Sequence, residues 1–520
     1  MGSNLEAVQL LALNKISKGA AFFDSLKHPL MPTTIADRML RFAGAPRQVY
    51  LGRVGLPGEY SNALEMFDQQ VDLACAHILG ETSEPNPNRT SAAVPIRHGG
   101  LAYTKVSLIA NAAFLGAAAN ASYALLAALP DGLPPRFSRA LSEALASTHN
   151  NLDPDDTANL LPPQSCSSLE FMQFFGTPET RCRAFQLQKR INRKFTKRAA
   201  DAELLSASPL RKACIKATNA KWAAQWLTLP TGDDRTVNEA FNLAARMRCG
   251  LAPAPVMPSH CHCGADLSND AYHCLAHSAG SSEAIRGHNN IAKVLAREVR
   301  RAGGQAWLEP RFQLDGGNDE HTDIRIALGA ELIYVDVSVV HPTCASYLRD
   351  SVVSSLAAAR RAETRKNRQY LDRAQRDHAT FVPFILETYG GFGRSARNLV
   401  NKIAGHARAH SEIWSTQNIK TKLLRGIFEE LHLRNLRMMT DQLNRCHRPP
   451  PPRSGRSQTQ PQLQTQTRSQ AQTQFTANPR RHRRSRRSPP VPATRAPLPT
   501  LAVQDQPEPQ NPPTHRHDQT

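Results

Sequence analysis

The chain has 520 residues, which is enough for two or three domains with sizeable cores and excludes a small scaffold held together by disulfides. Lys and Arg outnumber Asp and Glu by 64 to 44, and the formal net charge of +20 favours a polyanionic partner such as nucleic acid over a surface that is basic only for solubility. The ten cysteines are scattered apart from Cys261, Cys263 and Cys274, and no signal-peptide pattern opens the chain. We therefore expect a reducing compartment and a metal site rather than a disulfide framework.

Residues 1–250 are predicted to be mainly helical. The segment 62–80 carries apolar residues at helical spacing and ends at Gly80, as a helix does. The apolar run 108–130 is long enough to cross a membrane, but it is rich in Ala and contains two Asn. This composition favours a buried helix, so we expect no membrane contact.

A basic segment at 181–200 is also predicted to form a helix. Its charged face is either simply solvated or follows the phosphates of a nucleic acid, and the sequence leaves both interpretations open. Beyond it, the Pro-rich stretch 251–260 is typical of a hinge and predicts a domain boundary after residue 250.

Residues 251–282 contain the cluster CHCGADLSNDAYHCLAH. Two cysteines separated by one residue are followed, after nine residues, by two histidines separated by three. Thiolates and imidazoles in a group of four are the usual ligands of structural zinc, so we predict a Zn²⁺-binding knuckle. Cys274 is an alternative ligand, and a reduced, metal-free loop is the competing interpretation. The predicted ligands are Cys261, Cys263, His273 and His277.

Residues 283–405 have the pattern of an α/β domain with a mixed sheet. A helix is predicted at 283–304, two apolar strands within 321–342, and a long helix from about 344 to 377. A C-terminal helix is predicted at 406–446. The expected fold class is therefore multidomain, with a mainly α-helical N-terminal half, a small zinc knuckle, an α/β domain and a disordered tail.

The tail at 447–520 consists mainly of Pro, Gln, Thr, Ser and Arg, with twelve Arg against three acidic residues. It has too few large apolar residues to bury the surface that folding requires, so we predict disorder. Within it, RRHRRSRR at 480–487 is typical of a nuclear-localisation signal or a nucleic-acid contact. The candidate contacts are Arg480, Arg481, Arg483 and Arg484.

Two aspartates lie on the otherwise apolar strands of 321–342. If Gly329 and Ala330 form a two-residue turn, Asp323 lies opposite Asp336, and both aspartates share the face that is not buried. The predicted buried face consists of Ile324, Ile326, Leu328, Ile333, Val335, Val337 and Val339.

Like charges directly opposite each other destabilise an antiparallel pair, so Asp323 and Asp336 need compensation. A divalent cation, protonation of one carboxyl group, or neutralisation by Arg325 and neighbouring arginines would each supply it. A three-residue turn would instead send the aspartates to opposite faces, but it would also split the apolar set. An exposed hairpin without a metal is the remaining interpretation.

At these residues the sequence resembles the restriction-like endonuclease domain of non-LTR retrotransposon polyproteins, a branch of the PD-(D/E)XK nuclease superfamily. In that pattern, acids on two successive strands bind Mg²⁺, and a lysine follows the second acid by two residues. Asp323 and Asp336 match the acids. Thr322 replaces the proline that precedes the first acid, and Ser338 stands where the lysine would be.

The resemblance implies further site residues. In this branch the following helix commonly supplies the missing lysine, which makes Lys366 the candidate and Tyr370 its companion, four residues apart on one helix face. Glu309 resembles an upstream acid that completes the metal site. Glu387, within the similar segment 381–400, has a structural or catalytic role in this interpretation.

RGHNN at 286–290 resembles the Arg-His-Asn motif that joins knuckle and nuclease, with Gly287 inserted. Arg286 and His288 are the implied nucleic-acid contacts, with a structural role of His288 as the alternative. The knuckle supports the same family, although His277 stands where the family usually has Cys. Together with VPIRHGGLA, WLTLP and RMRCGLAP, which resemble the thumb and linker of such polyproteins, the similarity covers about residues 20–410.

The resemblance therefore implies a Mg²⁺-dependent endonuclease that nicks target DNA and exposes a 3′-hydroxyl for primed reverse transcription. Its implied partners are DNA, the RNA of the element and the polymerase part of the same polyprotein, and its implied location is the nucleus. The chain contains no Tyr/Phe-x-Asp-Asp palm motif, so we expect no polymerase activity from it. A catalytically decayed nucleic-acid-binding fragment is the alternative.

Overall fold

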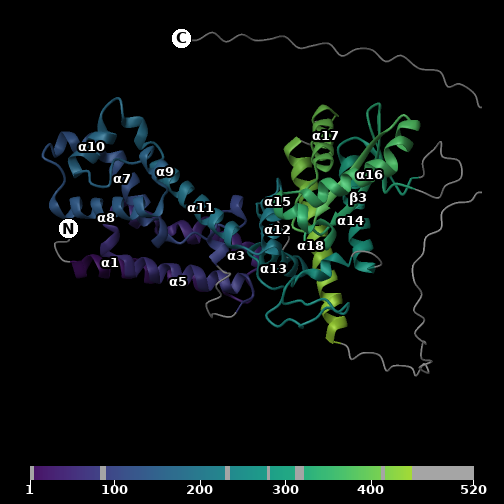
Figure 1. Cartoon of the computed structure of the whole chain (residues 1–520), viewed down its shortest axis with the longest axis horizontal. Helices are drawn as coiled ribbons and strands as arrows, with labels where there is room; N and C mark the ends of the chain where they lie inside the picture. Colours follow the sequence, from purple (N-terminus) through teal and green to yellow (C-terminus); the bar gives the residue numbers. More distant parts are fainter. Residues whose placement is uncertain are drawn as a thin grey trace, which may run out of the picture. The chain divides into compact units, whose positions relative to one another are not determined.

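The computed structural model describes residues 5–81, 90–228, 235–277, 281–310, 321–410 and 416–447. These residues are mostly helical and contain one four-stranded mixed sheet, as expected (Figure 1). The predicted tail at 447–520, apart from the helical backbone of its first residue, lies outside the described residues. Its candidate contacts Arg480, Arg481, Arg483 and Arg484 therefore have no described placement.

The secondary-structure elements described before residue 250 are all helices, in agreement with the helical pattern of the sequence. The helices are α1 (Leu5–Ser17), α2 (Ala20–Leu26), α3 (Thr33–Met39), α4 (Val49–Val54), α5 (Ser61–Ile78), α6 (Thr90–Ala93), α7 (Val106–Ala128), α8 (Pro135–Asn151), α9 (Pro154–Ala158), α10 (Ser168–Gly176), α11 (Leu187–Ser206), α12 (Pro209–Thr218) and α13 (Arg235–Cys249). Helix α5 ends where predicted, because Gly80 adopts a left-handed backbone with a φ of 63°.

Helix α7 contains most of the apolar run at 108–130. By length and composition it is the one described helix that could cross a membrane, and half of its most apolar window is buried. It packs against α4, α5, α8, α10 and α11, and its buried residues include Phe114 and Leu115. These contacts are those of a core helix, as the Ala-rich composition predicted.

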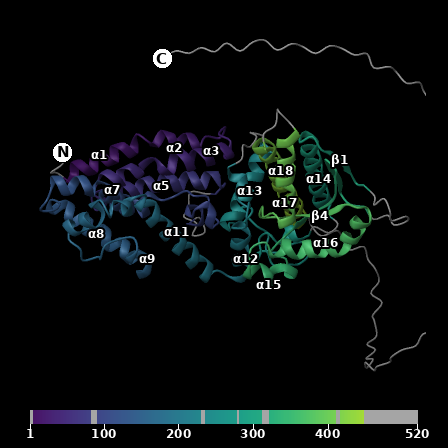
Figure 2. The ribbon, with the colours of Figure 1, turned by 90° about the horizontal axis from the view of Figure 1, so that it is seen from above.

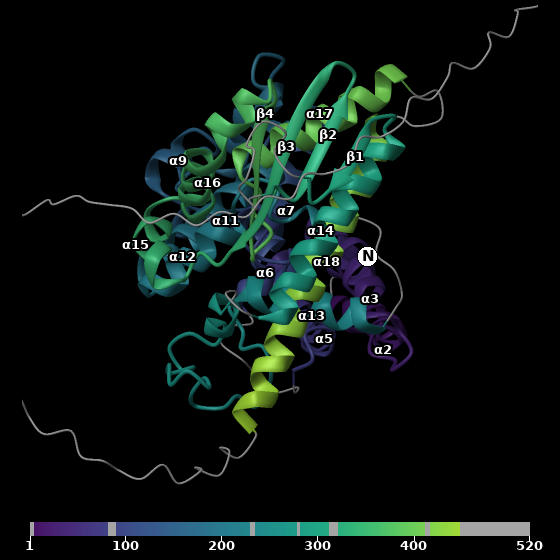
Figure 3. The same ribbon diagram turned by 90° about the vertical axis from the view of Figure 1, so that its right-hand side faces the viewer.

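The sheet and its helices follow in the second part of the chain. The elements are α14 (Ser282–Arg301), β1 (Gln305–Leu308), β2 (Ile324–Leu328), β3 (Glu331–Val340), α15 (Ala345–Val353), α16 (Ala357–Arg376), β4 (Thr380–Glu387), α17 (Arg394–His410) and α18 (Thr416–His447). The strands lie in the order β1-β2-β3-β4 (Figure 3). The pairs β1–β2 and β2–β3 are antiparallel, and β3–β4 is parallel.

The predicted hairpin register is confirmed. Ile324 pairs with Val335, and Leu328 pairs with Glu331 across a two-residue turn. Gly329 begins this turn with a φ of 61°, a conformation that glycine adopts without strain. Six of the seven residues predicted on the inner face are buried, and Val339 is half-buried.

The described pairing of β2 with β3 begins at Ile324, so it does not include the preceding residue, Asp323. The Asp323 amide donates to the carbonyl of Val335 at 3.1 Å, so Asp323 leaves the ladder instead of pairing directly with Asp336. The two aspartates nevertheless line one cavity. The prediction that Asp323 lies directly opposite Asp336 was therefore wrong. The prediction that both carboxylates lie close together is confirmed.

Helices cover both faces of the sheet, with α14 and α16 on opposite sides of it (Figure 2). The apolar hairpin face packs in the main core with residues of α14, α17 and α18. Helix α16 covers the other face and contacts β3 and β4. This arrangement places α16 over the face that carries Asp336.

The single long helix expected from about 344 to 377 is wrong. The chain forms α15 and α16 with a break at 354–356, where Leu356 has a φ of 60°. The carboxyl group of the buried Glu387 accepts from the amide of Ala359 in the first turn of α16. A helix has unpaired N–H groups in its first turn, and Glu387 accepts from one of them. Whether Glu387 also has a catalytic role stays a prediction.

The main apolar core continues on both sides of the Pro-rich stretch 251–260. Trp226 packs edge-on against His432 of α18, with ring centroids 4.9 Å apart, and residues from both sides of the stretch belong to one apolar cluster. The boundaries expected after residues 250, 282 and 405 stay predictions.

Candidate active site and metal centre

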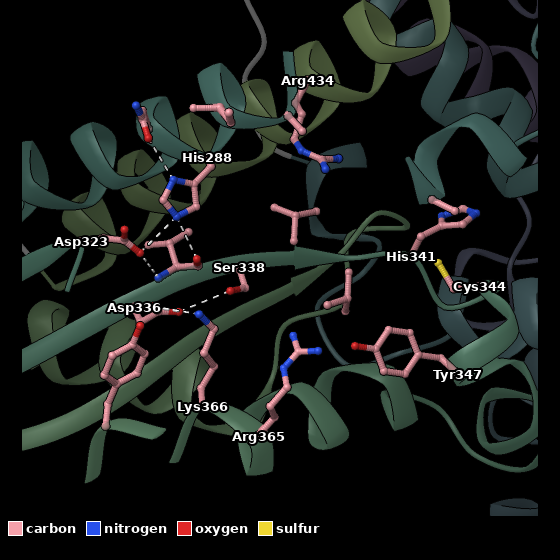
Figure 4. A pocket seen from close by; sticks show the side chains of 18 of the residues that line it. His288, Asp323, Asp336, Ser338, His341, Cys344, Tyr347, Arg365, Lys366 and Arg434 are labelled. Atoms are coloured by element: carbon pink, nitrogen blue, oxygen red, sulfur yellow. Dashed lines mark hydrogen bonds and ion pairs between the residues drawn. The ribbon is translucent and has the colours of Figure 1, made fainter. Parts of the chain in front are cut away.

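A cavity of about 820 Å³ opens at the sheet, between α14, α16 and α18 (Figure 4). Its polar lining combines carboxylates with basic side chains. The polar residues that line it include His288, Asn289, Glu309, His321, Asp323, Asp336, Ser338, His341, Arg365, Lys366 and Arg434. Carboxylates and cations in one cavity are the groups that metal-assisted chemistry on a phosphate ester needs.

Asp336 is the innermost carboxylate of the cavity and is only 5% exposed. Lys366 of α16 donates to its Oδ1 at 3.0 Å, and the hydroxyl of Ser338 donates to its Oδ2 at 3.3 Å. Burial raises the pKa of Asp336, Lys366 opposes this rise, and the negative charge of Asp323 adds to it. The lysine expected from the helix therefore reaches back to the second aspartate.

Asp323 is held by groups on two other elements. Its Oδ2 accepts from the Val337 amide at 2.6 Å and lies 3.1 Å from Nε2 of His288 on α14. Burial alone would lower the pKa of His288. The hydrogen bond to Asp323, the negative charge of that carboxylate and the hydrogen bond to Asn289 instead raise it to about 9. His288 is therefore cationic at neutral pH and compensates Asp323.

The other expected residues have different placements. Tyr370 is buried beside Lys366, whose Nζ lies 5.4 Å from the centre of the ring, and both line the cavity. Glu309 is exposed at the cavity, with a φ of 50° and its amide bonded to the Asp323 carbonyl. Arg286 is exposed, pairs with Glu283 at 3.4 Å and is not among the lining residues.

The sequence interpretation missed several cavity residues, two of which are arginines. Arg365 is adjacent to Lys366 and reaches the cavity from α16, so its position in the chain could have indicated it. Arg434 reaches the same cavity from α18, almost 100 residues after Asp336, and no local motif marks it. Figure 4 shows the two guanidinium groups on either side of the cavity, beyond Ser338 as seen from the aspartates.

The cysteine and histidine cluster forms a second centre. The ligand atoms of all four predicted residues lie within 4.8 Å of one another. Sγ of Cys261 lies 3.4 Å from Nε2 of His277, and Sγ of Cys263 lies 3.4 Å from Nε2 of His273. Cys274 is buried, with its Sγ 3.8 Å from that of Cys261, and does not belong to this group.

These distances fit a zinc ion. With Zn–S about 2.3 Å and Zn–N about 2.0–2.1 Å, tetrahedral geometry separates a sulfur and a nitrogen ligand by roughly 3.6 Å. The two observed sulfur–nitrogen distances are close to this value. The group of Cys261, Cys263, His273 and His277 can therefore hold a metal such as zinc.

The knuckle also borders the cavity at the sheet. Ala276, directly before His277, lines the cavity wall. Asp270 of the knuckle accepts from the hydroxyl of Thr343 at 3.3 Å, just after β3. A metal held by His277 would thus order a segment that borders the cavity.

No protein-family model matches the chain, and no curated protein matches it.

Proposed function

We propose that the chain is a Mg²⁺-dependent DNA endonuclease of the non-LTR retrotransposon type, which nicks target DNA for primed reverse transcription. The observation that carries the proposal is the contact of 3.0 Å between Lys366 and Asp336, in the same cavity as Asp323. Because Ser338 stands where the nuclease pattern has its lysine, the pattern requires a lysine from elsewhere. Lys366 satisfies this requirement.

Asp323 and Asp336 would hold the Mg²⁺ ion. Carboxylate oxygens are its preferred protein ligands, and both contacts of Asp323 use Oδ2, so Oδ1 has no protein partner in the part of the chain that the structure describes. When bound, the ion would polarise the phosphodiester and activate a water molecule. Glu309, exposed at the cavity, is the proposed third acid.

Lys366 and His288 would add positive charge from the protein to that of the metal ion. In the proposed reaction the Lys366 ammonium donates to a phosphoryl oxygen and stabilises the charge that develops there. His288 would orient Asp323 through its contact with Oδ2. The proposed reaction is the hydrolysis of one phosphodiester bond, which leaves a 3′-hydroxyl and a 5′-phosphate.

The proposed partners are target DNA, the RNA of the element and the polymerase part of the polyprotein, and the proposed location is the nucleus. The net charge of +20 and the basic helix α11 support binding to a polyanion. The Zn²⁺-binding knuckle and the Arg-rich tail would add contacts that position the nucleic acid rather than read its sequence.

The test is a nicking assay on supercoiled plasmid with Mg²⁺. Wild type should produce open circles, and Asp336→Ala should abolish them because it removes a metal ligand. Asp372→Ala is the matched control, since Asp372 is an exposed aspartate on the outside of α16 and should behave as wild type. Equal nicking by wild type and Asp336→Ala would refute the proposal.

One observation favours a second candidate, a catalytically decayed nucleic-acid-binding fragment. Both oxygens of Asp336 already accept from protein donors, Lys366 and Ser338, as in a structural ion pair. This candidate predicts salt-dependent DNA binding without cleavage at any Mg²⁺ concentration.

A further inference from the structure

Arg434 is a buried arginine whose positive charge has no ion-pair partner in the described part of the chain. Its side chain is fully buried, and the residue is only 2% exposed. Its one hydrogen bond in the described part of the chain goes to the Asn435 side chain at 3.2 Å, and its buried Nε has no acceptor there. A buried guanidinium without a carboxylate is costly, and burial lowers the pKa of Arg434 to about 10.

The neighbouring helix is built to admit this side chain. A Cβ at Gly287 would lie 2.5 Å from both Cβ and Cγ of Arg434, closer than atoms can pack. Glycine inside a helix is destabilising relative to alanine, and the close approach of Arg434 explains its place in α14. Gly287 thus lets Arg434 pass α14 and reach the cavity.

The surroundings of Arg434 are suited to an anion. Arg365 faces the same cavity from α16 and forms no ion pair within the described ranges (Figure 4). His341, also at the cavity, is completely buried, and burial together with the charge of Arg434 lowers its pKa to about 3. It therefore remains neutral beside the guanidinium.

We infer that Arg434 and Arg365 form a subsite for a phosphodiester of the bound strand, next to the one that is cleaved. The inference rests on the proposed function for the identity of the strand. Guanidinium groups bind phosphate through paired, charge-assisted hydrogen bonds, and a phosphate would supply the negative charge that Arg434 lacks. The two arginines would then bind one phosphodiester of the DNA strand, and the aspartates would act on the neighbouring one.

The test measures binding of a labelled DNA duplex without divalent metal, so that it does not depend on cleavage. Arg434→Met should weaken binding by roughly tenfold or more and reduce the slope of log K against log salt by about one. Arg365→Met should also weaken binding and reduce the slope. Because Arg365 is exposed, its replacement should not disturb folding. Arg425→Met, on the same helix but paired with Glu429, is the matched control and should change affinity less than twofold.

Thermal unfolding without DNA separates binding from a structural role. Removing an uncompensated buried charge should keep or raise the Tm of Arg434→Met, whereas a structural arginine would lower it. Unchanged salt slopes in both Arg434→Met and Arg365→Met would overturn the inference even if the wild type nicks DNA. Reduced slopes in a protein that does not nick would support the subsite and refute only the proposed cleavage.

Discussion

Lys366 donates to Asp336 across 30 positions of sequence, at 3.0 Å, from a helix to the central part of a strand. The pair is largely buried, with 19% and 8% of the two side chains exposed. A buried lysine beside a carboxylate is held in one place by both charge and packing, so its ammonium has a fixed position in the cavity.

Replacing this lysine should affect catalysis more than binding. Lys366→Met should reduce the rate of plasmid nicking about 100-fold or more, because it removes a positive charge from the reacting phosphate. DNA affinity should change much less. Single-turnover nicking and a binding titration in parallel would measure both, and Arg368→Met, an exposed residue on the same helix, is the control. Equal losses in binding and rate would contradict this role.

A lysine should be able to fulfil this role from β3 as well as from α16. In a Lys366→Met background, Ser338→Lys would return a lysine to the strand position of the nuclease pattern, two residues after Asp336. We expect it to recover part of the lost rate, at least tenfold over Lys366→Met alone, in the nicking assay. Ser338→Ala should stay within about threefold of wild type, since its hydrogen bond of 3.3 Å is weak. A double variant no faster than Lys366→Met would argue against the equivalence.

The knuckle should bind one zinc ion per chain. Cys263→Ser and His273→Ala should each lose the ion and lower the Tm, because metal binding contributes directly to the stability of such segments. Cys274→Ala should retain the ion, since Cys274 lies outside the ligand group. Metal content measured by elemental analysis would decide this, and loss of zinc from Cys274→Ala would identify Cys274 as the ligand in place of His277.

Glu387 should make stability depend on pH. Burial raises its pKa from 4.5 to about 7, although the Ala359 amide and Arg360 oppose the rise. Between these two values the folded chain holds a proton that the unfolded chain releases, so stability falls as pH increases, by about 3 kcal/mol in total. Glu387→Gln should therefore match wild type near pH 4.5 and have a higher Tm at pH 8. A Tm difference that stays constant from pH 5 to 8 would contradict the assignment.

Local features of the sequence predicted the hairpin and the group of Cys and His side chains that could hold a metal. A two-residue turn that begins at Gly329 places the apolar residues of both strands on one face, and the four knuckle residues lie within 17 consecutive residues. The lysine position came from a resemblance to a family pattern. No physical property of 363–370 alone would have distinguished Lys366 from its basic neighbours.

Other features depend on contacts between distant segments. The break before α16 requires a left-handed Leu356, which no propensity favours, and it is associated with the cap that Glu387 provides from β4. Arg434 reaches the cavity only because α18 packs on α14 at Gly287. The departure of Asp323 from the ladder likewise depends on His288 and Val337, which bind its carboxylate.

The break at Leu356 also determines which kinds of mutation this site can tolerate. Because α16 starts at a fixed point, each later side chain has a fixed direction around the helix axis, and Lys366 faces Asp336 by its count from that start. Deleting one residue between the break and Lys366 would turn every later side chain by about 100° and direct the ammonium away from the cavity. Substitutions on the outside of this helix can therefore accumulate, whereas a change of one residue in its length would separate the lysine from the aspartate.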